Sequence, residues 1–191
     1  MSAKQSNKLN QRSRAFSLVL NDNELNLFKS SNNILKQIMI SGTDWLFVAV
    51  CMHDKDFDNE RHCYKTKHYH LVLSFGGVHQ LESVIKLMVE LFKCNQNQVS
   101  CEKCNSIPMQ VRYMVHLDDF DKHRYDFADI VSNRDDIVNK YLHMNIKLVD
   151  VEDLYAVMRE YPHLDDLIAN IGLDNYKKWR VVIQDLRRDR Y

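Results

Sequence analysis

Histidine is the residue type whose spacing in this sequence most clearly suggests chemistry. His68 and His70 flank Tyr69 in an alternating stretch that reads HYHLVLSF. Side chains two residues apart on a β-strand point to the same face, so a strand here presents both imidazoles together. Tyr69 and the later apolar residues of the stretch suit a buried face. The two histidines are therefore expected on the other face, where a role in the core is disfavoured.

A third histidine precedes this pair in the pattern HDKD, which supplies His53 and Asp56. His53 follows residues 45–52, the most apolar stretch of the chain, which predicts a buried central strand. If that strand pairs antiparallel with the strand of the histidine pair, three imidazoles and one carboxylate converge at one sheet edge. Such a set is a divalent-metal site, and its imidazoles suit Mn²⁺, Zn²⁺ or Co²⁺ better than Mg²⁺. The alternative is that these are surface histidines beside a charged loop.

About forty residues further on, Tyr113 and His116 occur three residues apart in a segment that predicts a helix over 107–117. Residues at this spacing share a helix face, so the phenol can be a nucleophile that its neighbour orients. It can equally be a buried phenol with a polar partner, as is common in protein cores. Lys122 and Tyr125 follow in the same segment. The residues by themselves leave both readings open.

Composition excludes few functions. The chain has 191 residues and a net charge of +0, yet its first twenty residues carry four cations and no acid. The last sixteen are also basic, and both segments suit either plain solvation or a nucleic-acid partner. The five cysteines predict reduced thiols rather than a disulfide framework, and the single pair Cys101-x-x-Cys104 is read as coincidence. No apolar run suits a bilayer or a signal peptide, which predicts a cytoplasmic protein without a membrane partner.

The elements that must position these residues follow the order strand, helix, strand, strand, helix, strand. The expected strands are 14–20, 45–52, 68–75 and 99–102, and the expected helices are one ending near Ser41, then 81–92 and 107–117. This is the split β-α-β order of ferredoxin-like sheets. It predicts an α+β fold with an antiparallel sheet, helices on one face and the other face open. Past residue 133 the pattern is wholly helical and too short for a self-sufficient core, so this tail must dock on the first domain or on another copy.

Three ordered motifs together resemble one family. The HDKD turn, the KHYHLVLSF strand and the segment RYMVHLDDFDKHRYD are similar to the replication initiators of small Gram-positive rolling-circle plasmids, within the HUH endonuclease superfamily, single-tyrosine type. The resemblance implies metal ligands at His53, Asp56, His68 and His70, and a catalytic Tyr113 assisted by His116 and Lys122. It covers residues 14–133. Two features depart from the family pattern: Lys67 stands where Pro is frequent, and the cysteine pair has no counterpart.

The resemblance also implies a mechanism and partners. Metal-assisted attack of Tyr113 on single-stranded or hairpin origin DNA gives a 5′-phosphotyrosine link and a free 3′-OH, with Mn²⁺ as the foremost metal and Mg²⁺, Co²⁺ or Zn²⁺ as others. DNA-binding roles are predicted for Arg12, Arg14, Lys65, Lys67, Arg112 and Tyr125, with Lys122 as a further phosphate contact. The expected organisation is a disordered basic segment 1–13, a nicking domain 14–133 and a helical domain 134–191 that forms a homo-oligomer. Host replication proteins are further partners of such an initiator.

Other functions fit parts of the pattern. A related single-tyrosine transposase or relaxase uses the same chemistry, although the order of the motifs disfavours a relaxase. A DNA-binding repressor with a structural metal explains the basic segments, and a metallohydrolase explains the metal without a covalent intermediate. Chelation separates a nicking enzyme from such a repressor. Removing a structural metal unfolds a protein, whereas removing a catalytic metal leaves it folded and inactive.

Overall fold

The chain forms two compact units, residues 1–142 and 143–191. The computed structural model describes residues 11–22, 27–119, 121–143, 154, 157–159 and 163–188. Residues 1–10 of the segment 1–13 that is predicted to be disordered lie outside these ranges, as do residues 144–153 of the predicted helical tail. No described helix is long and apolar enough to cross a membrane.

The first unit is built on a five-stranded sheet in the order β6-β1-β5-β2-β7. Its strands are β1 Arg12–Asn21, β2 Trp45–His53, β5 His68–Gln80, β6 Val99–Lys103 and β7 Ile130–Ser132. All neighbouring strands pair antiparallel. The first four follow the split β-α-β order, and β7 extends the sheet at its edge. The predicted α+β fold with a ferredoxin-like sheet and C-terminal helices is confirmed.

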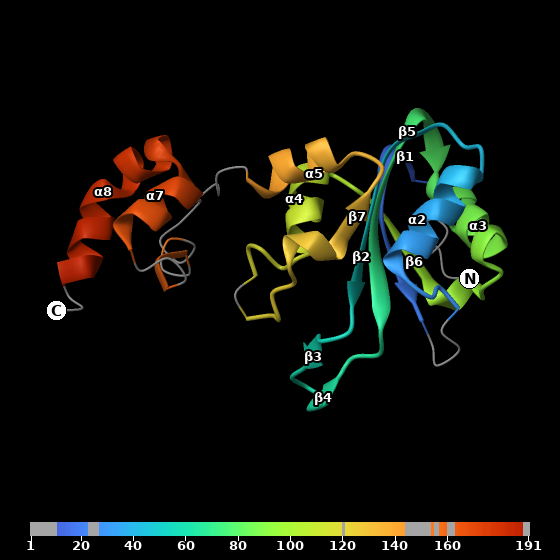
Figure 1. Cartoon of the computed structure of the whole chain (residues 1–191), viewed down its shortest axis with the longest axis horizontal. Coiled ribbons are helices and arrows are strands. Elements are labelled where there is room, and N and C mark those ends of the chain that lie inside the picture. The colour runs from blue at the N-terminus through green and yellow to red at the C-terminus, as the bar shows by residue number, and fades with distance from the viewer. Residues whose placement is uncertain are drawn as a thin grey trace. The chain divides into compact units, whose positions relative to one another are not determined.

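One face of the sheet carries two helices, α2 Ser31–Ile40 and α3 Leu81–Phe92 (Figure 1). The alternating strands β1 and β5 send Phe16, Leu18, Leu71 and Leu73 to this face, where they are at most 2% exposed. Each such side chain contributes about 1.5–3 kcal/mol by its removal from water. The histidine pair of β5 therefore points to the opposite face, as its alternation with Tyr69 predicts.

The opposite face is not left fully open. Two helices on that side, α4 Ile107–Tyr113 and α5 Asp135–Leu142, form a second core with the sheet (Figure 1). The cause lies in β2, where Phe47 and Ala49 face this side while Val48 and Val50 face the first core. A strand that is apolar on both faces needs cover on both.

Some predicted boundaries need correction. Helix α2 begins after Ser30, whose Oγ accepts a hydrogen bond from Asn33 N, and ends at Ile40, next to the predicted end at Ser41. Helix α4 ends at Tyr113, since the next residues form a turn in which His116 has a φ of 51°. Helix α5 was assigned to the tail, but it packs in the second core of the first unit, so the division falls at residue 142 instead of 133.

The second unit contains helices α7 Leu164–Ile171 and α8 Leu173–Arg188. Leu154, Val157, Met158, Leu167, Ile171 and Ile183 form its buried apolar cluster. Gly172 ends α7 with a φ of 80°, a conformation that favours glycine, as the sequence indicates.

Candidate metal centre and tyrosine site

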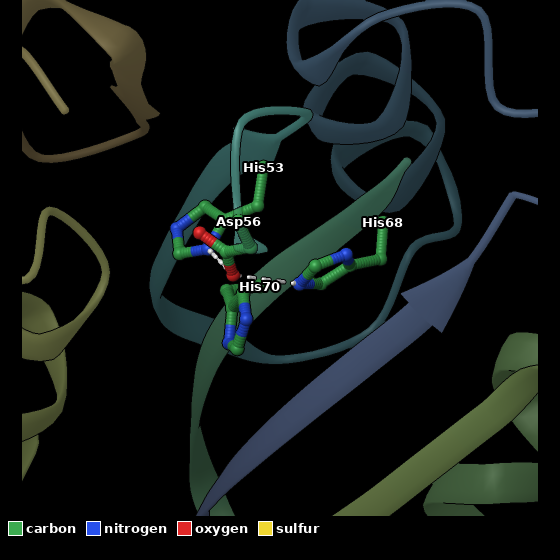
Figure 2. A group of neighbouring side chains, drawn as sticks. All are labelled: His53, Asp56, His68 and His70. Atoms are coloured by element: carbon green, nitrogen blue, oxygen red, sulfur yellow. Dashed lines mark hydrogen bonds and ion pairs between the residues drawn. The ribbon is translucent and has the colours of Figure 1, made fainter. Parts of the chain in front are cut away.

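Strand register brings the predicted metal ligands together. His53, the last residue of β2, lies directly opposite His68, the first residue of β5, and His70 follows on the same face. Asp56 reaches back from the loop after β2, so that its Oδ2 lies 3.2 Å from His53 Nδ1 and 3.4 Å from His68 Nε2 (Figure 2). The four residues each offer a ligand atom, all within 4.8 Å of one another. This set is the one that the sequence predicts.

The cluster is buried, and His70 and Asp56 are in the protonation state that a cation needs. Its four members are between 0% and 9% exposed. Burial lowers the pKa of His70 to about 2, so that imidazole is neutral. Burial alone would raise the pKa of Asp56, but hydrogen bonds with His53 and His68 outweigh it and hold this pKa well below its ordinary value. Neutral imidazoles and an ionised carboxylate are the forms that coordinate a divalent cation.

Backbone carbonyls fix two of the imidazoles. His53 Nε2 lies 2.6 Å from the carbonyl oxygen of Met114, and His68 Nδ1 lies 2.9 Å from that of Thr66. Because a carbonyl only accepts, each of these nitrogens carries a proton, and the other nitrogen of each ring faces Asp56 Oδ2, where it is the atom available to a cation. Metal-binding histidines are oriented by such partners. The donor set therefore fits a divalent cation, and Met114, directly after Tyr113, ties the tyrosine segment to it.

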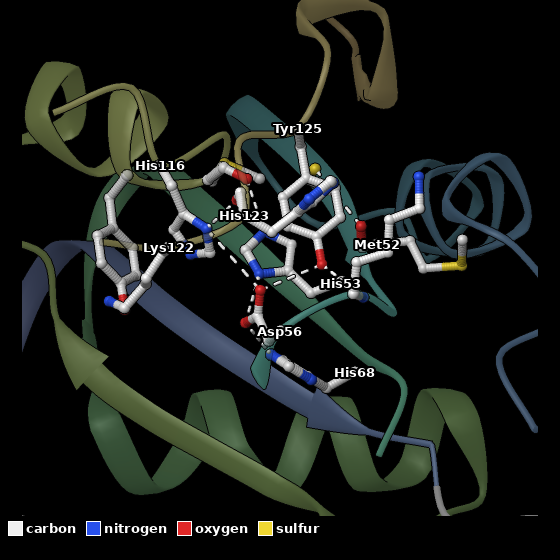
Figure 3. Close-up of polar contacts among 12 residues, drawn as sticks. Met52, His53, Asp56, His68, His116, Lys122, His123 and Tyr125 are labelled. Atoms are coloured by element: carbon white, nitrogen blue, oxygen red, sulfur yellow. Dashed lines mark hydrogen bonds and ion pairs between the residues drawn. The ribbon is translucent and has the colours of Figure 1, made fainter. Parts of the chain in front are cut away.

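Tyr125 packs against two members of the cluster, His53 and Asp56 (Figure 3). Its ring stacks on His53 at a centroid distance of 4.2 Å, and its hydroxyl donates to Asp56 Oδ1 at 3.1 Å. The Tyr125 hydroxyl oxygen also accepts a hydrogen bond from Lys55 N at 2.9 Å. Tyr125 is 5% exposed and burial raises the pKa of its phenol, so it suits neither the DNA-contact role predicted for it nor that of a nucleophile. We reassign it to positioning Asp56.

We expect Tyr125→Phe to weaken Mn²⁺ binding by about 10-fold, the low end of the effect of losing a hydrogen bond to a metal ligand. A Mn²⁺ titration followed by electron paramagnetic resonance measures this change. Unchanged affinity would remove the positioning role from Tyr125.

Tyr113 lies at the C-terminal end of α4, beside the cluster and open to solvent. Its ring centroid is 5.7 Å from that of His70, and its side chain is 38% exposed. Lys122 Nζ donates to the Tyr113 hydroxyl at 3.2 Å and to Asp119 Oδ2 at 2.6 Å. Although burial alone lowers the pKa of Lys122, these two hydrogen bonds raise it above its ordinary value, so the group stays cationic. An ammonium ion beside a phenol oxygen stabilises negative charge there.

His116 is close to Tyr113 but turned away from its hydroxyl. The two ring centroids are 5.4 Å apart, and His116 Nδ1 donates to the carbonyl of His123 at 2.7 Å. Among the described residues its buried Nε2 has no hydrogen-bond partner. Burial lowers the pKa of His116, so the ring is neutral and faces the cluster, 4.7 Å from the His53 ring. Of the two predicted helpers of the tyrosine, only Lys122 touches its hydroxyl.

The predicted DNA contacts have different surroundings. Arg112 is 4% exposed, because it binds Asp118 through two nitrogens and donates to the carbonyl of Leu142 at 3.0 Å. It therefore fastens α4 to the end of α5 instead of facing DNA. Arg12 and Arg14 are exposed at the end of β1 remote from the cluster, since Arg12 pairs with Gln80 whereas Asn21 pairs with His68.

Two of the predicted DNA-contacting lysines lie nearer to the metal cluster than Arg12 and Arg14 do. Lys67 Nζ forms an ion pair with Asp22 at 2.9 Å, and Lys65 lines a groove that also contains Tyr113. All five cysteines are free in the structure. The pair Cys101 and Cys104 is buried away from the metal cluster.

A five-stranded antiparallel sheet thus carries the histidine–aspartate cluster and the adjacent tyrosine. Residues 8–137 match the family model described as "Plasmid replication protein, origin binding domain". The chain belongs to this family of plasmid replication proteins.

Curated relatives point the same way. Over 85 residues, 44% of this chain and 40% of the relative, the chain is 33% identical to a "Replication protein" of Staphylococcus aureus. Over 81 residues, 41% of this chain and 34% of the relative, it is 35% identical to "Replication protein RepB" of Lactiplantibacillus plantarum. A "Replication protein" of Onion yellows phytoplasma is 30% identical over 120 residues, 54% of this chain and 30% of the relative. The matched segment thus spans well under half of each relative.

Proposed function

We propose that this chain is an HUH-type initiator that nicks single-stranded origin DNA through Tyr113. The observation that carries the proposal is the position of the phenol, which is exposed, bound by Lys122, and adjacent to His70 of a buried cluster able to hold a cation. An origin-binding family explains why such a site occurs in this chain. A structural metal site alone does not call for an exposed tyrosine and a lysine beside it.

The proposed reaction exchanges one phosphodiester for another. The Tyr113 oxygen attacks the phosphorus of the scissile phosphate in line, the bond from phosphorus to the 3′-oxygen breaks, and that oxygen takes up a proton. The phenol proton leaves to water, since Tyr113 is partly exposed. Lys122 is already protonated, so it stabilises charge on the attacking oxygen instead of acting as the base. When bound, a divalent cation supplies Lewis acidity toward a non-bridging phosphate oxygen.

His53, Asp56, His68 and His70 are the residues that would hold this cation. Mn²⁺ is the first metal to test, with Mg²⁺, Co²⁺ and Zn²⁺ as comparisons. The 5′-phosphotyrosine link keeps the energy of the broken ester, so the strand can later be rejoined, and the released 3′-OH can be extended by a polymerase.

Lys122→Gln should slow cleavage by about 10- to 100-fold without changing the nucleophile, an effect reduced from that of a buried donor because the ammonium is partly exposed. Single-turnover cleavage of one oligonucleotide measures it. Lys86→Gln, on the opposite face of the sheet in α3, is the matched control and should cleave at the wild-type rate. Equal rates for the two variants would remove Lys122 from the mechanism.

The direct test incubates the full chain with Mn²⁺ and a pool of single-stranded oligonucleotides and analyses the mixture on a denaturing gel. We expect a slowly migrating protein–DNA band that disappears with EDTA. Cleavage without such a band would identify water as the nucleophile and overturn the tyrosine mechanism. The assignment of residues 143–191 to self-association stays a prediction.

A further inference from the structure

A short hairpin projects from the sheet beyond the ends of β2 and β5 (Figure 1). It consists of β3 Phe57–Asp58 and β4 Cys63–Tyr64. Phe57 is 47% exposed and Tyr64 is 70% exposed, and their rings meet edge to face at 5.5 Å. Neither ring belongs to an apolar core cluster of the described residues. Phe57 and Tyr64 are cross-strand partners, and the ring surface that this pair leaves exposed is available to a partner.

Tyr64 borders a groove that leads to the proposed nucleophile. This groove of about 490 Å³ is lined by Arg61, Tyr64 and Lys65 from the hairpin, and by His70, Tyr113 and Lys122 from the site. A second groove, of about 620 Å³, is lined by Phe57, Tyr64 and Lys122 among others. The hairpin therefore lies beside any strand that passes Tyr113.

The charges around the first groove suit an anionic strand. Arg61, Lys65 and Lys122 contribute three positive charges, against Asp56 and Asp58, and the exposed Arg61 side chain has its Nε 3.9 Å from Asp58 Oδ2. Asp56 is committed to the histidine cluster, and Asp58 accepts hydrogen bonds from Glu60 N and Arg61 N within the hairpin turn. Exposed aromatic rings next to cations are the combination that binds single-stranded nucleic acid, because unpaired bases stack on the rings while cations contact the phosphates. In a duplex the base faces are not available to such a ring.

We propose that the β3–β4 hairpin binds unpaired nucleotides next to the scissile phosphate, with Tyr64 stacking on a base and Arg61 and Lys65 contacting the backbone. The inference rests on the proposed nicking function and adds a specificity-determining contact to it. The hairpin distinguishes unpaired from paired DNA at the nick, so its loss affects single strands and not duplexes.

The test measures binding of the full chain in a Tyr113→Phe background, which prevents covalent capture. The probe is a fluorescent pool of random 30-nucleotide single strands, and the readout is anisotropy. We expect Tyr64→Ala to weaken binding by about 5- to 100-fold, the loss from one stacked base, and Tyr64→Phe to stay within about twofold of the parent. Ile40→Ala, at 73% exposure on α2 and outside both grooves, is the matched control and should not change binding.

Duplexes of the same pool should bind Tyr64→Ala and its parent equally. Equal single-strand affinity of Tyr64→Ala and the parent, or an equal loss on single strands and duplexes, would overturn the inference. Failure of the proposed function is seen separately, as the absence of any covalent adduct in the chain that retains Tyr113. Because Tyr64 is mostly exposed, its truncation should leave the melting temperature unchanged, and thermal unfolding checks that the variant is folded.

Discussion

Tyr113→Phe is expected to form no covalent protein–DNA adduct, while its affinity for single-stranded DNA stays within about twofold of the wild type. The substitution removes one oxygen from an exposed ring, so the fold and the ring contact with His70 are retained. Removing the nucleophile of an enzyme costs at least about 10³-fold in rate, because the other groups cannot replace it. Denaturing gels measure the adduct, and anisotropy of the same oligonucleotide measures binding.

Tyr125→Phe is the matched control for this variant. It also removes one phenol oxygen near the cluster, but from a buried hydroxyl that donates to Asp56. At saturating Mn²⁺ it should still form the adduct. An adduct that persists in Tyr113→Phe and vanishes in Tyr125→Phe would identify Tyr125 as the nucleophile and contradict the role proposed for Tyr113.

The second large effect is expected for Asp56→Asn, which should lose more than about 100-fold in Mn²⁺ affinity and show no adduct at micromolar metal. Asparagine keeps the size of the side chain but removes the only charge among the four ligands, and the loss of a ligand exceeds the 10- to 100-fold effect of losing a partner of a ligand. Isothermal titration with Mn²⁺ measures the affinity. Asp54→Asn, an exposed acid in the same turn, is the control that should bind metal normally.

EDTA separates a catalytic metal from a structural one. The cluster lies at the end of β2 and β5, whereas the two cores of the first unit continue along the sheet under four helices. We therefore expect the circular dichroism spectrum to be unchanged by EDTA. Unfolding on chelation would favour a repressor with a structural metal.

The metal cluster was predictable because it depends on two simple regularities. Alternation along β5 places His68 and His70 on one face whatever the rest of the fold does. The antiparallel pairing of consecutive apolar strands then brings His53 opposite His68. Both follow from local sequence, so the three histidines are predictable as a set, and Asp56 joins them because it follows His53 by three residues in the HDKD turn.

The surroundings of the cluster were less predictable, since they depend on side-chain partners distant in sequence. Arg112 reads as a surface cation, and only the packing of α4 on α5 shows that it binds Asp118 and a helix-end carbonyl. Tyr125 is a polar aromatic in a charged segment, yet its hydroxyl is buried against Asp56. Neither partnership has a periodic signal in the sequence.

Strand β2 is apolar on both faces, and this feature predicts that helices cover both faces of the sheet. Its residues 47–51 contain no polar side chain, and such a strand requires helices on both faces. In the structure α4 and α5 supply this cover on the face that is expected to be open. The hairpin carried no comparable signal, because two-residue strands are too short to show alternation.

The measurement that tests the central claim most directly uses one single-stranded oligonucleotide, selected from the pool, with different labels at its two ends. The account predicts that the covalent adduct carries the 3′-end label, that the released fragment carries the 5′-end label and is extended by a polymerase, and that proteolysis of the adduct followed by mass spectrometry finds the nucleotide on Tyr113. An adduct that carries the 5′-end label, or a nucleotide attached to any other residue, would contradict it.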